Sequence, residues 1–457
     1  APAPRRGFDR RAWREPRPSP ALIRALGWVN RAVVLPPLVR LRRFALPDAD
    51  VARLRAAVHP GAAAFLGPNH PEFFTDWMVD KELSFRVSPL MAHWASYEIV
   101  NVSPAAQWLW LRNNLIANVP GGGGREYSIR WALAGHGVLL HPEGTASWHG
   151  ERVGPLLPGI VDLAWATCER ARVAGRDRPV YVVPIVWRLR FTGDVTRALD
   201  REMATMEREL GLTSGARLPL GQRFAALQAE LLTSRCAALG LPAPPDARGH
   251  LYFDAQHVVE AAIVRELETL GARVVRDPAR IQHRTRRAAR REGRREHDLY
   301  GELWRLTGFP RDLYDTPTLT LEAIAENLKR QRSCLLTEGW RNALRNVVPV
   351  PAGPRVAHVR VAEPIAVHEA FSPEGDGAAI RAALLAELAR RLQGALDALR
   401  AELAPLLAGS HRPNPLWTGS TLVMAAAYRL AAGSQQWIVV AALAVVVVSE
   451  RRHLRQK

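Results

Sequence analysis

The chain is poor in cysteine and lysine and lacks a long hydrophobic run, and each shortage narrows what the protein can be. Its 457 residues include three cysteines, which lie far apart and show no Cys-x-x-Cys spacing. They predict neither a disulfide framework nor a metal site, and they fit a reducing compartment. A membrane-spanning helix needs about 20 consecutive apolar residues, whereas the run at residues 437–448 has twelve. A buried core segment and an interfacial or re-entrant segment are therefore equally expected around residues 430–449, ahead of a spanning helix.

The shortage of lysine makes the positive charge almost entirely arginine. Three lysines stand among 62 basic residues, and the formal net charge is +18. The charge is concentrated in residues 1–45 (net +9), in residues 276–295 (net +7) and after residue 450. Basic patches on a near-neutral body predict contact with a polyanion, either an anionic membrane surface or nucleic acid. Because residues 276–295 contain no nucleic-acid-binding motif and no aromatic side chain, we expect a solvated helix face or lipid contact there, and no specific nucleic-acid partner.

Short apolar runs alternate with helical stretches between residues 60 and 190. Alternation of this kind predicts an α/β fold, with a sheet flanked by helices. Strands are expected at 62–66, 115–119, 138–140 and 180–186, and helices at 75–82, 104–112, 126–135 and 159–172. Further along, residues 195–346 are mostly helical in pattern, a strand is expected at 356–361, and a last helix is expected at 377–404.

These patterns divide the chain into a leading arm and helix, one interrupted domain and a C-terminal segment. Leu22, Leu26, Val29 and Val33 recur at helical spacing, and Trp28 beside them is a common interfacial anchor. This helix either docks on a membrane or packs on its own domain. The parts are a disordered basic arm at 1–20, an amphipathic membrane-docking helix at 21–46 that ends in a basic turn, an α/β domain at 47–194 and 355–408, a helical insertion at 195–354, and an apolar C-terminal segment with a basic tail at 409–457.

The loop after the first expected strand carries a histidine and a downstream carboxylate. Residues 67–76 read GPNHPEFFTD. Pro71 is favoured at the first position of a helix, and Asp76, one to two turns on, can reach back to the imidazole of His70. The two form a base with an orienting carboxylate, as acyl transfer requires, although a purely structural pair has the same pattern. Since no Gly-x-Ser-x-Gly elbow accompanies them, His70 would activate the hydroxyl of the substrate itself.

Two more loops follow expected strands. Residues 141–147 read HPEGTAS, in which Gly144 and Thr145 would expose backbone N–H groups and Glu143 could bind substrate hydroxyls or a cationic group. Residues 183–186 read VPIV and offer nothing reactive. The four glycines at 121–124 lack the Gly-Lys-Ser/Thr of a P-loop. We therefore expect them to form a flexible loop near the site where the substrate hydroxyl binds, rather than a nucleotide site.

The order and spacing of these motifs resemble the phospholipid/glycerol acyltransferase family, which includes lysophosphatidate and glycerol-3-phosphate acyltransferases. The resemblance rests on Asn69-His70 followed by Asp76, on Pro-Glu-Gly-Thr at 142–145, and on Val-Pro-Ile at 183–185. It covers residues 60–190 and resumes at 359–367, where Val-Ala-Glu-Pro-Ile is similar to the closing strand of the family. The resemblance implies a mixed sheet flanked by helices.

The resemblance also implies roles for individual residues. His70 would be the general base that deprotonates an acceptor hydroxyl, and Asp76 would orient it. The donor would be acyl-CoA or an acyl-carrier protein, with no cofactor, no metal and no acyl-enzyme. The residues expected to bind the acceptor head group are Asn69, Glu143, Gly144, Thr145 and, as phosphate ligands, Arg112, Arg125 or Arg152.

The sequence departs from the family pattern in three places. Five residues separate His70 from Asp76 instead of four, which would rotate the carboxylate by about 100° on a regular helix. Ala146 stands where the family has an arginine, and the middle motif is replaced by residues 115–124, with their glycine run.

The function that the resemblance implies is acyl transfer to a hydroxyl of a glycerol-phosphate or lysophospholipid-type acceptor. The protein would be cytoplasmic and peripheral or monotopic at the inner face of the membrane.

Three alternatives remain open. The first is acyl transfer to an acceptor without phosphate. The second is a lipid-binding protein that kept the fold but is catalytically weak or inactive. The third is a metal-dependent hydrolase that uses His70, Glu72, Asp76 and His141, although these residues lack a metal-ligand spacing such as His-x-x-x-His.

Overall fold

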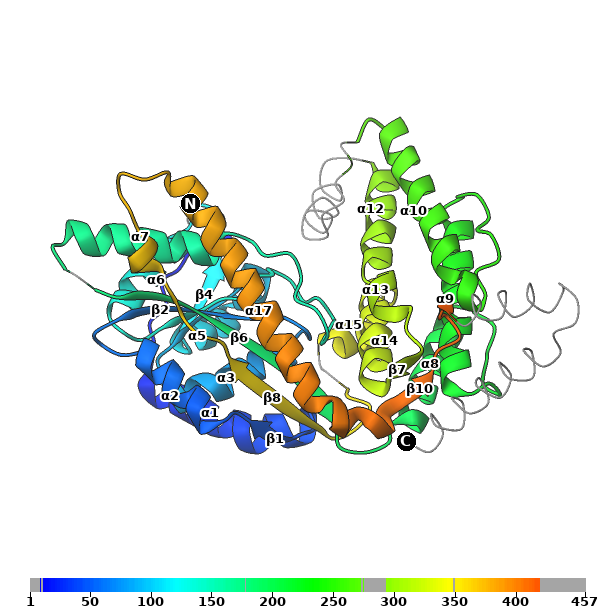
Figure 1. The fold of residues 1–457 in the computed structure, drawn as a ribbon, viewed down its shortest axis with the longest axis horizontal. Coiled ribbons are helices and arrows are strands. Elements are labelled where there is room, and N and C mark those ends of the chain that lie inside the picture. Colours follow the sequence, from blue (N-terminus) through cyan, green and yellow to red (C-terminus); the bar gives the residue numbers. More distant parts are fainter. Residues whose placement is uncertain are drawn as a thin grey trace, which may run out of the picture. The chain divides into compact units, whose positions relative to one another are not determined.

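The computed structural model describes residues 9, 11–176, 178–272, 274, 293–347 and 350–419 (Figure 1). The chain forms two compact units, one of Ala1–Thr192 with Val347–Ala401 and one of Gly193–Asn346 with Glu402–Lys457. The first division therefore lies within a few residues of the expected start of the helical insertion. The second falls between Asn346 and Val347, a few residues before the expected end of the insertion at 354. The third lies inside helix α17 (Gly377–Leu407), so the residues after it join the helical unit.

The first unit is built on a mixed, mostly parallel sheet, as the α/β pattern predicted. Its order is β1-β8-β6-β2-β5-β3-β4, and β9 also pairs with β6. Strand β8 runs antiparallel to β6 but parallel to β1. The central strand β2 is buried along its whole length, as is typical of a parallel strand covered on both faces. The bounds are β1 Leu41–Ala45, β2 Ala63–Pro68, β3 Ala92–Ser96, β4 Leu115–Asn118, β5 Val138–Leu139, β6 Val180–Phe191, β8 Arg355–Val361 and β9 Ile365–Ala366.

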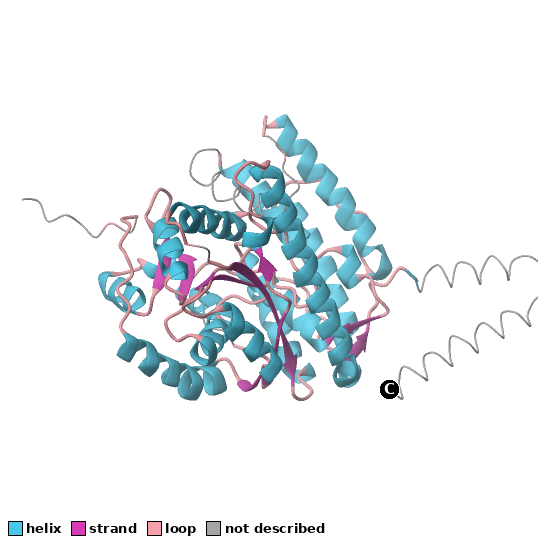
Figure 2. Cartoon of the chain, turned by 60° about the vertical axis from the view of Figure 1, so that its left-hand side comes forward, coloured by secondary structure: helices cyan, strands magenta, loops and turns pink. Residues whose placement is uncertain are grey.

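Helices cover both faces of this sheet, as Figures 1 and 2 show. Helices α1, α2 and α3 lie on one side, and α7 with α17 lies on the other. The core on the first side includes Leu54, Leu66, Val79, Leu83 and Trp187, all of them fully or almost fully buried. The bounds are α1 Pro20–Val29, η1 (a π-type helix) Asn30–Leu38, α2 Asp48–Ala57, α3 Thr75–Val87, α4 Tyr97–Val100, α5 Pro104–Arg112, α6 Gly124–Leu133, α7 Gly159–Val173 and α16 Val367–Ala370.

Most expected elements of this unit are confirmed within a few residues, and local signals explain why. Helix α5 begins at the expected residue because the Ser103 hydroxyl accepts a hydrogen bond from the Ala106 N–H and Pro104 follows the cap. Two expectations are wrong. The basic turn expected near residues 40–43 is largely strand β1, and β3, which was not expected, pairs with both β4 and β5.

The leading arm also differs from the expectation of a disordered segment at residues 1–20. Residues 1–8 and 10 lie outside the described part, but residues 11–19 pack on the α/β unit. The Arg17 N–H donates to the Leu111 carbonyl, and the Trp13 indole lies against Gly123, where a Cβ would come within 2.6 Å of the ring nitrogen. The glycine run after β4 therefore serves a close approach of the arm, because any larger side chain at Gly123 would collide with Trp13.

In its described residues, the second unit is helical apart from one short two-stranded ribbon. Strand β10 (His411–Pro413) pairs antiparallel with β7 (Thr318–Thr320), which joins the residues after α17 to this unit. The bounds are α8 Thr196–Glu209, α9 Leu220–Ala238, η2 Gly249–Leu251, α10 Tyr252–Thr269, α12 Arg294–Thr307, α13 Arg311–Tyr314, α14 Leu321–Leu335, α15 Trp340–Val347 and η3 Ala408–Ser410.

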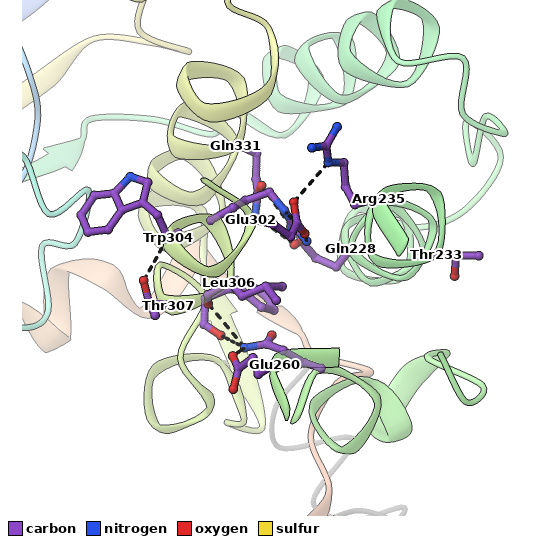
Figure 3. A network of polar contacts seen from close by, with 12 residues as sticks. Gln228, Thr233, Arg235, Glu260, Glu302, Trp304, Leu306, Thr307 and Gln331 are labelled. Carbon is purple, nitrogen blue, oxygen red and sulfur yellow. Dashed lines mark hydrogen bonds and ion pairs between the residues drawn. The ribbon is translucent and has the colours of Figure 1, made fainter. Parts of the chain in front are cut away.

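The interior of the helical unit contains buried ions as well as aromatic rings. Arg305 and Glu302 are 1% and 2% exposed in their side chains, and Arg305 Nε lies 2.8 Å from Glu302 Oε1. The second oxygen of Glu302 accepts from Arg235 Nε at 3.1 Å, a contact drawn in Figure 3. Gln228 and Gln331 from α9 and α14 are also fully buried and meet at 3.4 Å. Helices α9, α12 and α14 are thus joined by polar contacts in the interior.

None of the helices in the described part of the chain combines the length and the apolar character that crossing a membrane requires. The apolar run at residues 437–448 lies outside the described residues, as does most of the arginine-rich stretch at 276–295. The three cysteines are free, with Cys168 and Cys236 buried.

Candidate active site

Two histidines meet where neighbouring parallel strands end. Strands β2 and β5 pair in parallel, with Leu66 opposite Leu139. His70 and His141 follow these strands by two residues each, so the pairing brings both to the same edge of the sheet. Their imidazole rings stack, with centroids 4.1 Å apart and an interplanar angle of 22°. Side chains at the carboxyl ends of such strands form the usual functional edge of an open α/β sheet.

The expected pair of His70 and Asp76 is in contact despite the additional residue between them. His70 Nδ1 lies 2.7 Å from Asp76 Oδ2. Helix α3 begins only at Thr75, and Phe74 before it has a positive φ of 70°. Residues 71–74 are therefore not helical, so the rotation of about 100° per residue does not apply to them. The turn places Asp76 in the first turn of α3, where a negative charge is favourable.

The Asp76 carboxylate is buried and holds its charge. Burial alone would raise the pKa of Asp76, but the facing imidazole of His70 outweighs that effect and keeps the pKa below its ordinary value. The other oxygen, Oδ1, accepts the Trp77 N–H at 2.5 Å. Since Asp76 occupies Nδ1 of His70, Nε2 is the ring nitrogen that remains for a substrate proton.

Asn69 is buried and fixes the loop that carries His70. The residue is 1% exposed. Its side-chain amide donates to the Trp187 carbonyl at 3.1 Å, and its side-chain oxygen accepts the Trp187 N–H at 2.9 Å. This two-way contact fastens the residue before His70 to strand β6 and supports a positioning role for Asn69, while its expected contact with an acceptor head group stays a prediction.

Glu143 has a similar position inside the site. Its carboxylate is 3% exposed and accepts two backbone N–H groups, that of His70 at 2.6 Å and that of Gly154 at 2.7 Å. Burial raises the pKa of Glu143, and these hydrogen bonds oppose the rise. The geometry therefore supports a structural role for Glu143 in holding the His70 loop, and its expected contact with an acceptor head group stays a prediction.

Gly144 and Thr145 form the open part of the second loop. Gly144 is exposed and has a φ of +69°, and Thr145 is half-buried. Ser147 returns the loop to the residues that follow β2, because its backbone N–H donates to the His70 carbonyl at 2.7 Å. Ala146, which stands at the position of the family arginine, is 7% exposed.

The three candidate arginines differ in position. Arg112 ends α5 and precedes β4, so it lies at the amino end of the parallel strands, opposite the edge that carries His70. Arg125 follows β4 and is exposed at the start of α6. Arg152 is half-buried, two residues before Gly154. Among the three, Arg152 is the closest along the chain to a group that supports the His70 loop.

Asp80 is a site residue that the sequence analysis missed. His141 Nε2 lies 2.9 Å from Asp80 Oδ2. His141 Nδ1 lies 3.1 Å from the Asn69 carbonyl oxygen. The available signal was the spacing of Asp80 from Asp76, since residues four apart share one face of a helix.

Ligand-type atoms of His70, Asp76 and His141 all lie within 4.8 Å of one another, which raises the question of a metal. An imidazole binds a metal through an unprotonated nitrogen. Both nitrogens of His141 face oxygen acceptors, from Asn69 and from Asp80, so both carry protons when Asp80 is ionised. Glu72, the fourth residue of the metal hypothesis, contacts Arg355 at 2.7 Å. The contacts therefore suit two proton-holding pairs better than a metal centre.

No protein-family model matches the chain, and no curated protein matches it either.

Proposed function

We propose that the protein transfers a fatty acyl group from acyl-CoA or an acyl-carrier protein to a hydroxyl of a glycerol-phosphate or lysophospholipid-type acceptor. The observation that carries this proposal is the contact of 2.7 Å between His70 Nδ1 and the buried carboxylate of Asp76. A carboxylate in this place fixes the tautomer with its proton on Nδ1, so that Nε2 can accept one. This arrangement supplies a general base at the functional edge of the sheet.

The proposed reaction uses the acceptor as its own nucleophile. The acceptor hydroxyl gives its proton to His70 Nε2 while its oxygen attacks the thioester carbonyl carbon. The tetrahedral intermediate then collapses, the C–S bond breaks, and the leaving thiolate takes the proton from His70. Asp76 stabilises the imidazolium between these two steps. The nearby hydroxyl of Ser147 donates to the His70 carbonyl at 3.2 Å, which directs it toward the backbone rather than toward the imidazole.

Arg125 and Arg152 are the candidate ligands for an acceptor phosphate, because both follow strands at the edge that carries His70, whereas Arg112 lies at the opposite end of the strands and Ala146 has no charge. An acceptor without phosphate is the alternative that follows from the same facts. The assay below distinguishes the two by its panel of acceptors.

An exposed apolar surface on the leading helices supports docking on an anionic membrane. Trp28, Val29, Val33 and Leu38 are 60%, 44%, 59% and 38% exposed. Such large side chains are seldom gathered on a free surface without a binding partner. The guanidinium of Arg31 beside them lies 5.8 Å from the centroid of Trp28 and pairs with Glu82 at 2.8 Å, so the support for docking comes from the apolar side chains and from Trp28 as an interfacial anchor.

The test is acyl transfer by the purified full chain. A radiolabelled long-chain acyl-CoA, or an acyl-carrier protein charged with the same chain, is offered with glycerol-3-phosphate, lysophosphatidate, other lysolipids and a membrane extract. His70→Ala is compared with His59→Ala, because His59 is exposed and precedes strand β2 where His70 follows it. We expect label in a lipid product, retained by His59→Ala and reduced about 10²- to 10⁴-fold by His70→Ala.

Each possible result has a definite meaning. Transfer only to phosphate-bearing acceptors supports the leading proposal, and transfer only to others favours the alternative acceptor. If no label moves from either donor while the protein binds anionic vesicles, the protein is a lipid-binding relative of such enzymes and the proposal is wrong.

A further inference from the structure

The site contains a second histidine–aspartate pair beside the first. Asp76 and Asp80 lie one turn apart on helix α3, and both are at least 95% buried. Each faces a different imidazole, because Asp76 contacts His70 at 2.7 Å and Asp80 contacts His141 at 2.9 Å. The two rings stack on each other. The four side chains therefore form two histidine–aspartate pairs that lie side by side, with both aspartates on one face of α3.

The contacts of His141 determine its protonation. Its Nδ1 lies 3.1 Å from the carbonyl oxygen of Asn69 and 3.2 Å from that of Pro68. Carbonyl oxygens accept hydrogen bonds only, so Nδ1 carries a proton. Its Nε2 faces the Asp80 carboxylate and carries the second. Burial alone would lower the pKa of His141, but Asp80 outweighs it and raises the pKa to about 9. Burial also raises the pKa of Asp80, and the facing His141 opposes that rise. The two carbonyl contacts of Nδ1 and the Asp80 contact of Nε2 are the geometric reason to assign the charged form to the pair.

Other charged groups near the stack come from three elements. Glu143 lies in the loop after β5 and accepts the N–H of His70. On β3, His93 has its pKa lowered well below the ordinary value by burial and by nearby Lys81 and His141, so it is neutral. On α3, burial lowers the pKa of Lys81 to about 7. His141 is thus the ionised imidazole in direct contact with His70.

We propose that His141 and Asp80 form a charged pair that holds the ring of His70 in place and places a positive charge directly against it. His141 is a positioning residue, because it touches the base and acts through it. The consequence for turnover rests on the proposed function, whereas the effect on the protonation of His70 does not. A base must be free of its proton before it can accept one from a substrate.

The sign of the effect follows from distance. The cationic ring of His141 stacks directly on His70, whereas the Asp80 carboxylate lies beyond the Nε2 edge of His141 and does not contact the His70 ring. The nearer charge is positive and opposes protonation of His70. Removing the charge of His141 while keeping a stacked ring should therefore raise the protonation midpoint of His70, and it leaves Asp80 as an uncompensated carboxylate that raises the midpoint further.

The experiment is a side-chain NMR titration of the full chain with ¹⁵N-labelled histidine. His70→Asn identifies the signals of His70. The variants are His141→Phe, which keeps an aromatic ring for stacking, and His141→Phe/Asp80→Asn, which also removes the buried carboxylate and so protects the fold. His136→Phe is the matched control, because His136 also lies against an aromatic ring, that of Trp131, but precedes β5 where His141 follows it.

We expect the midpoint of His70 to rise by about one pH unit in His141→Phe and by less in the double variant. It should not move in His136→Phe, and wild-type His141 should remain doubly protonated at pH 8. An unchanged or lowered midpoint in His141→Phe would overturn the proposal, as would a wild-type His141 that loses its second proton below pH 7.

Kinetics gives a separate readout. The acid limb of kcat/KM against pH should move upward in His141→Phe by the same amount as the NMR midpoint. Because the titration needs no turnover, the two inferences can fail separately. If the wild type transfers no acyl group but the NMR midpoint moves as expected, the proposed function is wrong and the charged pair stands.

Discussion

Replacing Glu143 by glutamine tests whether this carboxylate supports the His70 loop. Its two oxygens accept the N–H groups of His70 and Gly154 at 2.6 and 2.7 Å. Glutamine keeps one accepting oxygen but turns an NH₂ group toward the other N–H. Losing one charge-assisted hydrogen bond and burying an unpaired donor costs about 2–4 kcal/mol. Since burial raises the pKa of Glu143, a neutral side chain recovers part of this loss, and we expect about 2 kcal/mol.

The loss should be visible as faster hydrogen exchange in the segments that hold the two amides. A change of about 2 kcal/mol corresponds to roughly 30-fold faster exchange of these amides. Peptides that span residues 66–74 and 150–157 report it, and peptides from β4 serve as an internal reference. Gly154→Ala offers an independent route, because its Cβ would lie 2.6 Å from Glu143 Oε2. Unchanged exchange in Glu143→Gln, at unchanged global stability, would refute a supporting role for Glu143.

Two further predictions concern the helical unit and the exposed apolar surface of the leading helices. Glu302→Ala strands the buried Arg305 without its counter-ion and should cost about 3–5 kcal/mol in denaturant unfolding of the helical unit. Burial would raise the pKa of Glu302, but Arg305 outweighs it and holds that pKa below its ordinary value. The stabilising contribution of Glu302 is therefore present at neutral pH and is lost as the pH falls below about 4. A Glu302→Gln variant whose free energy of unfolding kept the same slope against pH on the acid side would contradict this assignment. Trp28→Asn/Val33→Asn should weaken co-sedimentation with anionic vesicles at least about tenfold. Val173→Asn, which alters an exposed valine on α7, should leave it unchanged. Equal binding by all variants would refute vesicle binding through Trp28 and Val33.

The sequence predicted most of the α/β unit because its signals are local. The buried run of β2 and the capped start of α5 are readable from neighbouring residues. Strand β1 was missed because it contains Arg42 and Arg43 and pairs only with β8, more than 300 residues away. No local pattern encodes a pairing of that kind.

The candidate site was predicted in its residue types better than in its contacts. His70 and Asp76 could be paired from their spacing, but the positive φ of Phe74 that brings them together cannot be derived from residue identity, since a non-glycine residue seldom adopts it. Glu143 was predicted to face an acceptor, yet its partner N–H belongs to Gly154, and the path of that loop depends on tertiary packing. Asp80 could have been found because it lies four residues after Asp76 on the same helix face, but only if the position of His141 against α3 had been known.

The pairing of β1 with β8 also delays completion of the sheet during synthesis of the chain. Strand β1 is complete at Ala45, but its partner is not made until Val361, after the whole helical insertion. At about 5–20 residues per second, the ribosome needs roughly 15 to 60 seconds to synthesise the intervening residues. Until β8 is made, β1 has no partner, and from the completion of β6 at Phe191 the edge of β6 that will pair with β8 is open to other chains. A chaperone that covers this edge during translation should matter more for this protein than for one whose neighbouring strands are made in succession.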